Sequence, residues 1–319
     1  MSTIGKLTAG AAVTALSALS GLALFTAWNS RRAERLVPAD GHFVQVDGAT
    51  LHYADIGRGP PIVMIHGLGG QLRNFTYALS ETLARDHRLI IVDRPGSGYS
   101  TFSAGTKDRG LFAQARMIVD LITALGIERP LLVGHSLGGA IALAAAVQFP
   151  QRIGGLALLA PLTQPIETVP DVFKALSLQS PVARAAIAWT LAAPLSRARP
   201  EAAQAQLFGP EEAPADFETR GGAALTLRPA AFQAAAADVE ACGVDMPILA
   251  RRYGELSLPV GILFAKEDRI LNFADHGPPT AQAIAGAELT AITGGHMFPL
   301  TQPALTGEWI RARAAAVGG

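Results

Sequence analysis

The residues that most constrain the fold of this chain are 131–148. An apolar run of leucines and valine leads into Gly134, Ser136 and Gly138, and alanine-rich helical sequence follows. This order predicts a strand, a sharp turn and a helix, with Ser136 at the apex of the turn. Glycine is needed at 134 and 138 because a side chain there would collide across the turn. Ser136 is therefore the candidate nucleophile, and the alternative is a glycine-rich turn with an incidental serine.

Composition restricts the class of protein before any other motif is considered. Of the 319 residues, 50% are hydrophobic and 16% are charged, which is enough to bury a large core. With 26 basic and 26 acidic residues the formal net charge is zero, so the chain lacks the excess of positive charge that is typical of nucleic-acid-binding proteins. The single cysteine, Cys242, excludes an intramolecular disulfide and fits a packed thiol.

The N-terminus carries an uncharged run of 22 residues, Leu7 to Trp28. As a helix it would be roughly 33 Å long, which is enough to cross a bilayer. We therefore expect residues 1–35 to be a membrane anchor with its flank. A cleavable signal peptide is the alternative, although its apolar region is usually shorter, about 7 to 15 residues. Arginines after the run favour a cytoplasmic catalytic domain, but positive charge also precedes it, so the side of the membrane stays open.

Alternating and continuous apolar segments predict the strands, and 3.6-residue spacing predicts the helices. The expected strands are 43–46, 50–54, 61–65, 89–92, 131–133, 154–159, 259–264 and 288–292, and the expected helices of the core are 71–85, 111–125 and 305–315. Residues 162–257 differ from the rest, because they form short alanine-rich helical pieces broken by proline and glycine. The predicted organisation is a core in two parts, 36–161 and 258–319, with 162–257 inserted as a helical cap.

The loop His66-Gly67-Leu68-Gly69-Gly70 follows a strand that reads as buried on both faces. It matches neither a dinucleotide fingerprint nor a Walker sequence, so no nucleotide cofactor is expected. A serine hydrolase needs a turn here that directs a backbone N–H at a developing oxyanion. The N–H groups of Leu68 and Leu137 are the candidates for this oxyanion hole.

A serine hydroxyl becomes a strong nucleophile when a histidine takes its proton and a carboxylate orients that histidine. Ser136, Asp268 and His296 each follow a predicted strand, and parallel strands end on the same edge of a sheet. They form the candidate catalytic triad. Glu267 is the alternative acid, and His276 is the alternative base.

Four further residues have a structural interpretation. Asp93 begins the turn 93–100 and is more typical of a charge that ties a loop down than of a catalytic acid. His135 is expected to pack beside the turn. His42 and His52 have no third ligand at a metal-binding spacing, so no metal site is predicted.

Taken together, these motifs resemble the α/β-hydrolase family over about residues 43 to 316. The resemblance rests on the Gly-x-Ser-x-Gly turn, the His66-Gly67 loop, the turn 93–100, and the chain order serine, aspartate, histidine. It implies an α/β fold with a mostly parallel, eight-stranded sheet, helices on both faces and an inserted helical cap. The fold alone does not determine the substrate.

Departures from subfamilies narrow the expected reaction. Haloalkane dehalogenases and epoxide hydrolases have an aspartate where Ser136 stands, and epoxide hydrolases place two tyrosines in the cap, where this chain has only Tyr253. Carbon–carbon bond hydrolases commonly have tryptophan at the position of Met297, and perhydrolases have an aromatic residue and proline at Leu68-Gly69.

The resemblance therefore implies a serine esterase or lipase-like hydrolase that cleaves a hydrophobic, small-molecule carboxylic ester through an acyl-enzyme. The alternatives are a carbon–carbon bond or other acyl hydrolase of the same fold, or a non-catalytic relative that binds a ligand under its cap.

Overall fold

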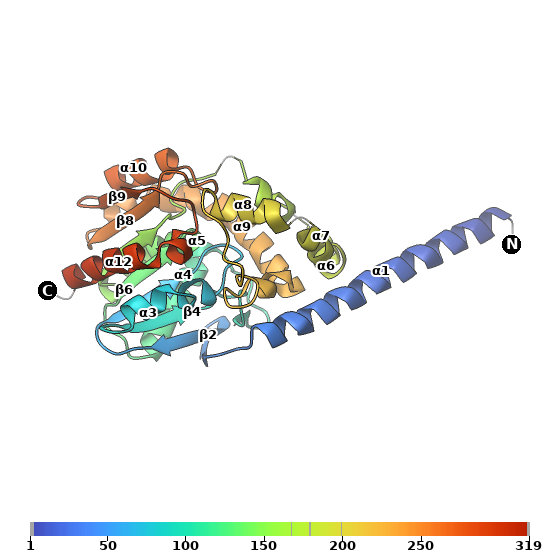
Figure 1. Cartoon of the computed structure of the whole chain (residues 1–319), viewed down its shortest axis with the longest axis horizontal. Coiled ribbons are helices and arrows are strands. Elements are labelled where there is room, and N and C mark those ends of the chain that lie inside the picture. Colours follow the sequence, from blue (N-terminus) through green and yellow to red (C-terminus); the bar gives the residue numbers. More distant parts are fainter. Residues whose placement is uncertain (1–2, 167, 179, 199, 318–319) are drawn as a thin grey trace.

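A mostly parallel sheet forms the centre of the protein (Figure 1). The computed structural model describes residues 3–166, 168–178, 180–198 and 200–317. Residues 1–2 of the predicted anchor, 167, 179 and 199 of the predicted cap, and 318–319 of the predicted core lie outside the described residues. Its strands are β1 (His42–Val46), β2 (Ala49–Ile56), β3 (Pro61–Ile65), β4 (Arg88–Val92), β5 (Thr101–Phe102), β6 (Leu131–His135), β7 (Gly155–Leu159), β8 (Val260–Ala265) and β9 (Glu288–Ile292). The order β1-β2-β4-β3-β6-β7-β8-β9 agrees with the predicted eight strands, and the two-residue β5 pairs with β2 as an addition.

Strand direction brings the functional loops to one edge. Strands β4, β3, β6, β7, β8 and β9 are parallel to one another, whereas β2 pairs antiparallel with β1, β4 and β5. In register, Ile65 lies opposite both Val92 and Gly134, so β4, β3 and β6 end level with one another. The loops after these strands therefore meet at the carboxyl edge, where open α/β sheets bind ligands.

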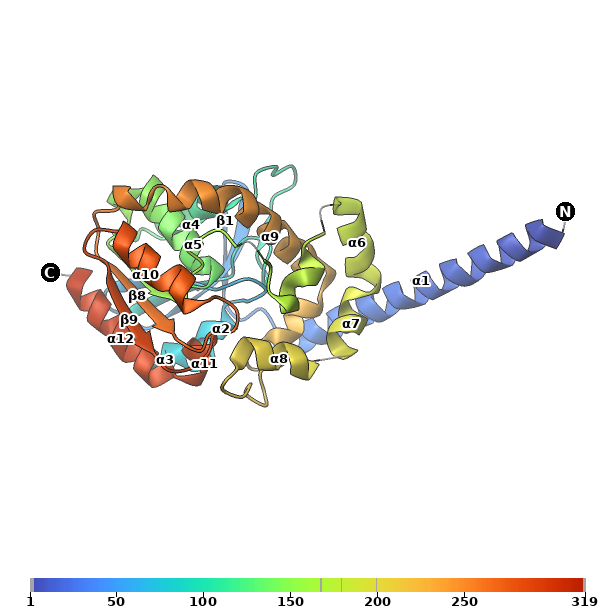
Figure 2. The ribbon, with the colours of Figure 1, turned by 90° about the horizontal axis from the view of Figure 1, so that it is seen from above.

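Helices cover both faces of the sheet. The core helices are α2 (Arg73–Thr76), α3 (Leu79–Leu83), α4 (Leu111–Ala124), α5 (Leu137–Gln148), α10 (Phe273–Ala283), α11 (Phe298–Thr301) and α12 (Pro303–Val317). Helices α4 and α5 pack together on one face, and α3 and α12 pack together on the other (Figure 2).

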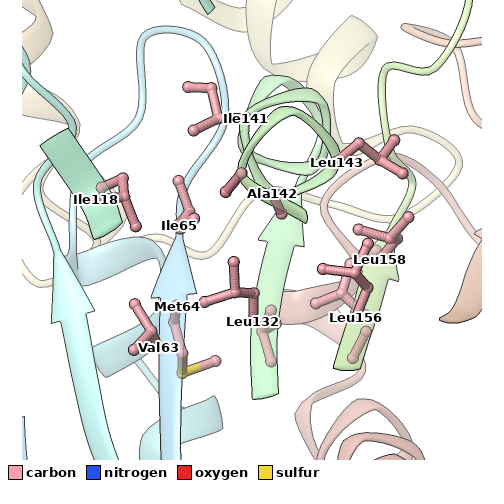
Figure 3. Close-up of a cluster of buried hydrophobic side chains, with 14 of the residues drawn as sticks. Val63, Met64, Ile65, Ile118, Leu132, Ile141, Ala142, Leu143, Leu156 and Leu158 are labelled. Carbon is pink, nitrogen blue, oxygen red and sulfur yellow. The ribbon is translucent and has the colours of Figure 1, made fainter. Parts of the chain in front are cut away.

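The core lies between the strands and α5. Side chains such as Met64, Ile65, Leu132 and Ile141 are fully buried there (Figure 3). Because both faces of the sheet are covered, its central strands are continuous apolar runs rather than alternating ones.

Residues 162–257, which we name the insertion, run between β7 and β8, and most of their described part is helical. They comprise η2 (Asp171–Leu176), α6 (Pro181–Thr190), α7 (Ala192–Ala198), α8 (Pro200–Phe208), η3 (Ala223–Leu227), α9 (Pro229–Ala250) and η4 (Tyr253–Glu255). The 22-residue α9 is the longest of them, and it packs against α4 and α5 of the core. The insertion is thus joined to the core through α9.

The predicted helix 71–85 is two short helices instead of one. Ala78 leaves the helical region with φ −151°, and this separates α2 from α3. The amide of Leu72, at the start of α2, donates to the Asp93 carboxylate at 2.7 Å. A long-range contact therefore sets where α2 begins, and the local spacing could not show it.

Helix α1 (Thr3–Leu36) contains the uncharged run on which the anchor prediction rests, and its length would suffice for a bilayer. Within the described part of the chain, no helix combines the length and the apolarity that a membrane span requires. The predicted N-terminal membrane anchor and the membrane-anchored localisation are therefore wrong.

The C-terminal end of α1 is docked on the insertion. Ala33 and Val37 are buried in a small cluster with Ala224 and Leu225 of η3. The Tyr99 hydroxyl donates to the carbonyl of Val37 at 2.5 Å. The segment after the uncharged run is thus part of the folded body, while the beginning of α1 projects from it in both views (Figures 1 and 2).

We predict that two N-terminal truncations have different effects. Deleting residues 1–20 should leave the thermal unfolding midpoint unchanged, because this part of α1 projects from the body. Deleting residues 1–37 should lower the free energy of unfolding by about 1–3 kcal/mol, because it uncovers Ala224 and Leu225. Calorimetry of both variants checks this, and equal midpoints would show that the docking contributes nothing.

Candidate active site

Ser136 occupies the turn between β6 and α5 in a strained conformation. Its φ of 53° and ψ of −121° are rare for a residue with a side chain and persist only where the surroundings enforce them. The Ser136 amide donates to Leu159 at 3.0 Å, and its carbonyl accepts from Gly139 and Leu162, each at 2.9 Å. These backbone hydrogen bonds fix the turn and leave the hydroxyl at the surface of a cavity.

The glycines around the turn are required by close approach. A Cβ added at Gly134 would lie 2.5 Å from the carbonyl oxygen of Gly138, and one at Gly138 would overlap the carbonyl of Ile65. A Cβ at Gly67 would lie 2.9 Å from that of Ser136. The end of β3, the turn and the start of α5 therefore pack backbone to backbone, as the sequence predicts.

His296 and Asp268 form a buried pair. Nδ1 of His296 lies 2.7 Å from Oδ2 of Asp268, whose side chain has no exposed surface. The other Asp268 oxygen accepts from the amides of Ile270 at 2.8 Å and Leu271 at 2.9 Å. With its oxygens occupied in this way, the carboxylate fixes both the ring orientation and the tautomer of His296, leaving Nε2 to act as a base.

The alternative acid has a different partner. The Glu267 carboxylate accepts from the amide of Gly294 at 2.7 Å. Glu267 thereby supports the loop that leads to His296. Among the described residues, no hydrogen bond joins Glu267 to the imidazole ring of His296.

Ser136 and His296 are brought to the same site without a direct hydrogen bond between them among the residues described. His135 connects the two, since it precedes Ser136 and its Nε2 donates to the His296 carbonyl at 3.0 Å. The two imidazole rings have centroids 4.8 Å apart. Burial, and then the neighbouring His296, lowers the pKa of His135 to about 3, so it stays neutral as a structural donor. Such nucleophile–base contacts are often long in unliganded enzymes and tighten on binding.

The amides of Leu68 and Leu137 flank the same cavity. Both residues line it together with Ser136, and neither N–H donates to an acceptor within the described chain. Unpartnered N–H groups beside a nucleophile are suited to stabilise negative charge that develops on a substrate oxygen. Leu137 is also the first residue of α5, where the helix dipole adds to this effect.

The cavity itself has a volume of about 200 Å³ and a mainly apolar lining. The core contributes residues such as Leu68, Leu137 and Ile270, and the insertion contributes others such as Phe173, Val239 and Met246. Cys242 lies in this wall, and burial raises the pKa of its thiol, so it remains protonated and apolar in character. A hydrophobic group of a substrate is therefore favoured next to Ser136.

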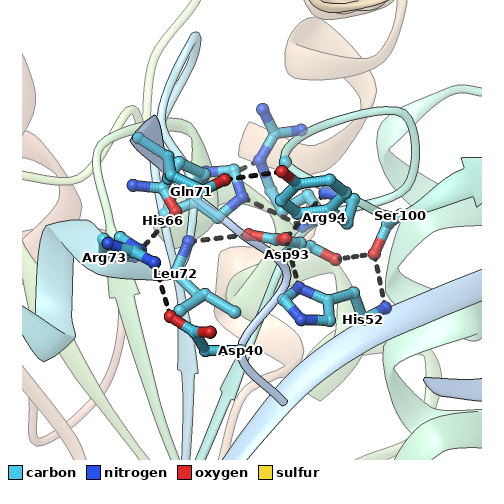
Figure 4. Close-up of polar contacts among 12 residues, drawn as sticks. Asp40, His52, His66, Gln71, Leu72, Arg73, Asp93, Arg94 and Ser100 are labelled. Carbon is cyan, nitrogen blue, oxygen red and sulfur yellow. Dashed lines mark hydrogen bonds and ion pairs between the residues drawn. The ribbon is translucent and has the colours of Figure 1, made fainter. Parts of the chain in front are cut away.

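The turn that begins at Asp93 is a structural network (Figure 4). The Asp93 carboxylate accepts from the amides of Leu72 at 2.7 Å and Tyr99 at 2.8 Å and lies 2.7 Å from Nδ1 of His52. The Ser100 hydroxyl donates to the Asp93 carbonyl at 2.7 Å. These contacts tie the loop down, in agreement with the interpretation of Asp93 as a structural carboxylate.

His276, the alternative base, is also occupied. Its Nδ1 accepts from the amides of Thr163 and Gln164, each at 3.2 Å. Burial lowers its pKa to about 4. This histidine holds the start of the insertion against α10 and is not directed at Ser136.

Sequence reasoning missed three charged residues that support the site. Arg94 and Asp238 form an ion pair at 2.9 Å and are almost completely buried. Glu211, in the insertion, accepts from the amide of Gly295 at 2.8 Å, next to His296. The only signal was Asp238 itself, which follows an alanine-rich run, and a charge on such a helix normally indicates a solvated face.

A strand–turn–helix serine, a buried histidine–aspartate pair and two unpartnered amides on a parallel sheet define the α/β-hydrolase class. The model of the alpha/beta hydrolase fold family matches residues 60–303, and the chain belongs to this family. Membership establishes the fold and the general type of site.

The proteins to which the chain is similar include hydrolases of several kinds. The chain is 38% identical over 114 residues to a 2-hydroxy-6-oxo-6-phenylhexa-2,4-dienoate hydrolase of Comamonas testosteroni, a match that covers 35% of this chain and 40% of that protein. An esterase from Thermogutta terrifontis superposes with a TM-score of 0.66 at 21% identity, over 87% of this chain and 99% of that chain. An enol-lactonase from Burkholderia xenovorans LB400 also gives 0.66 at 21% identity, over 85% and 98%. The structural similarities show the fold, and the sequence match spans less than half of its relative.

We predict that the protein loses stability between about pH 6.5 and 5. Burial holds the pKa of His66, His135 and His276 below the ordinary value of 6.5, so each stays neutral in the fold and takes a proton when unfolded. The unfolded state therefore binds more protons, and each histidine lowers the free energy of unfolding by about 1.4 kcal/mol per pH unit below 6.5.

Denaturant unfolding at pH 7, 6 and 5 measures this dependence. Because His276 lies outside the Ser136 site, His276→Gln is the control, and it should reduce the slope by one histidine's share. A wild-type stability that is constant or rises towards pH 5 would contradict the interpretation.

Proposed function

We propose that this protein is a serine hydrolase that cleaves carboxylic esters through an acyl-enzyme intermediate. One observation carries the proposal: the buried His296–Asp268 pair, 2.7 Å apart, contacts His135, which directly precedes a serine held at positive φ. The strained backbone of Ser136 and the buried carboxylate of Asp268 both cost folding free energy. General base catalysis by His296 requires both of them.

The first half-reaction acylates Ser136. Neutral Nε2 of His296 takes the hydroxyl proton as Oγ attacks the ester carbonyl carbon, and the carbonyl oxygen becomes an oxyanion. The amides of Leu68 and Leu137 stabilise this oxyanion. Asp268 stabilises the imidazolium, which then gives its proton to the alkoxide leaving group as the alcohol departs.

The second half-reaction releases the acid. His296 removes a proton from a water molecule, which attacks the acyl carbon, and the same two amides stabilise the second tetrahedral intermediate. Collapse of that intermediate breaks the bond to Oγ, and the proton returns to Ser136 from the imidazolium. No cofactor or metal enters any step.

The substrate that best fits is a small hydrophobic ester. The cavity beside Ser136 is apolar, and its volume of about 200 Å³ is below the roughly 300–1,000 Å³ of sites for drug-sized ligands. The insertion supplies part of its wall, and we infer that residues 162–257 act as a cap on the core parts 36–161 and 258–319. Contacts from both parts would then select the acyl group.

A carbon–carbon bond hydrolase is the second candidate. It is favoured by the 38% identity, over 114 residues, to the Comamonas testosteroni protein, which is named a dienoate hydrolase. Against it stands Met297, which is packed with Phe208 and Leu300 at the position where those enzymes commonly have tryptophan. Turnover of a 2-hydroxy-6-oxodienoate in preference to 4-nitrophenyl butyrate would favour this second candidate.

We predict that the three candidate catalytic residues differ in their contributions. Ser136→Ala and His296→Ala should each reduce kcat/KM for 4-nitrophenyl butyrate by several orders of magnitude, because each removes the nucleophile or its base. Asp268→Asn should cost less, because His296 retains its position but loses the stabilising charge. Steady-state kinetics, together with calorimetry to verify folding, checks these effects.

Glu267→Gln is the matched control for the acid, since Glu267 binds the Gly294 amide and not His296. It should keep most of the activity. An inactive Glu267→Gln beside a near-normal Asp268→Asn would reverse the assignment of the acid, and labelling of Ser136→Ala by a fluorophosphonate would exclude Ser136 as the nucleophile.

A further inference from the structure

Arg94 is completely buried, and its guanidinium connects three parts of the protein. Nε donates to the carbonyl of His66 at 3.1 Å, and Nη2 donates to that of Gly67 at 3.2 Å. Nη1 donates to the Gln114 side chain at 2.9 Å, and Nη2 also binds the Asp238 carboxylate at 2.9 Å. The loop before Leu68, helix α4 and helix α9 of the insertion thus share one cation.

The Gly67 carbonyl is the most constrained acceptor in this group. It accepts from Arg94, from Nδ1 of His66 at 2.8 Å and from the Gly70 amide at 3.2 Å. The tautomer of His66 is defined, because its Nε2 accepts from the Arg94 amide at 2.9 Å and Nδ1 must carry the proton. Burial, and then the charge of Arg94, lowers the pKa of His66, so this tautomer persists.

The direction of the Leu68 N–H follows from that carbonyl. Gly67 C=O and Leu68 N–H belong to one peptide plane, and in a trans peptide they point in opposite directions. Gly209–Pro210 has the only cis bond among the described residues, so the Gly67–Leu68 peptide is trans. Three donors on the Gly67 oxygen therefore orient the Leu68 N–H on the other side of the plane, where Leu68 borders the cavity.

The Asp238 carboxylate offsets the free-energy cost of burying the charge of Arg94. Its carboxylate is 4% exposed, and besides Arg94 it accepts from the Gln114 side chain at 2.8 Å. Removing one partner of such a pair leaves an uncompensated buried charge. Because Asp238 belongs to α9, the insertion contributes directly to the charge balance behind the oxyanion loop.

We propose that Arg94 is a positioning residue for the oxyanion hole, and that Asp238 couples the insertion to that hole through Arg94. The proposal rests on the function proposed above. Arg94 does not touch the substrate; it fixes the Gly67–Leu68 peptide so that the Leu68 N–H meets the oxyanion without reorganisation. The insertion therefore contributes to turnover through this contact as well as through the cavity wall.

The test compares Arg94→Lys and Asp238→Asn with a matched control on the same helix. A lysine has three N–H donors on a single nitrogen, so it cannot reproduce the planar fork with which Arg94 binds four separate oxygens. Glu240→Gln is the control, because Glu240 also lies on α9 and pairs with a cation, Arg184 at 2.5 Å, but contacts no part of the oxyanion loop.

We expect kcat for 4-nitrophenyl butyrate to fall about 10- to 100-fold in Arg94→Lys and Asp238→Asn, since misplacing an oxyanion donor costs less than removing it. KM should change little, because the planar ester does not use the hole. The inhibition constant of a trifluoromethyl ketone, which forms a tetrahedral oxyanion on serine, should rise in parallel with the loss in kcat. Glu240→Gln should match wild type in all three quantities.

The double variant Arg94→Gln/Asp238→Asn removes both charges and keeps the test valid if a single variant unfolds. Its melting temperature should return towards the wild-type value, whereas its kcat should stay as low as in the single variants. If kcat returns to the wild-type value with stability, or if the two variants behave as Glu240→Gln does, Arg94 has only a structural role. Full activity of Ser136→Ala would instead overturn the proposed function, so the two failures are distinguishable.

Discussion

The backbone of β3, the turn after β6 and the first residues of α5 lie so close together that glycine is required on both sides of the contact. A side chain at Gly138 would overlap the carbonyl of Ile65, and one at Gly67 would press on Ser136. This approach forces Ser136 to positive φ and sets its hydroxyl beside the amides of Leu68 and Leu137. The remaining parts of the site, including the histidine loop and the insertion, are arranged around that fixed point.

Much of the core could be predicted from the sequence because its strands carry a strong local signal. Segments such as 61–65 and 89–92 are continuous apolar runs, as a strand covered on both faces requires, and they match β3 and β4 closely. The pairing of Asp268 with His296 follows from strand order, since each residue comes after a parallel strand that ends at the same edge. Local pattern and topology agree at these positions.

The features that the sequence did not reveal depend on contacts between distant segments. Arg94 and Asp238 are 144 positions apart, and nothing near either residue indicates a buried partner. The start of α2 is held by a hydrogen bond from Leu72 to Asp93, and the end of α1 is docked through Val37 on Leu225. The anchor prediction is overturned by the structure itself, because no helix among the described residues has both the length and the apolarity of a membrane span.

The central claim is that Ser136 carries the acyl group during turnover. The most direct measurement is mass spectrometry of enzyme that is acid-quenched within milliseconds of mixing with 4-nitrophenyl butyrate, followed by peptide mapping. The account predicts a butyryl adduct on the peptide that contains Ser136. In Asp268→Asn the amount of this adduct should rise if the substitution slows deacylation more than it slows acylation. Turnover without any adduct on Ser136, or an adduct on another residue that persists in Ser136→Ala, would contradict it.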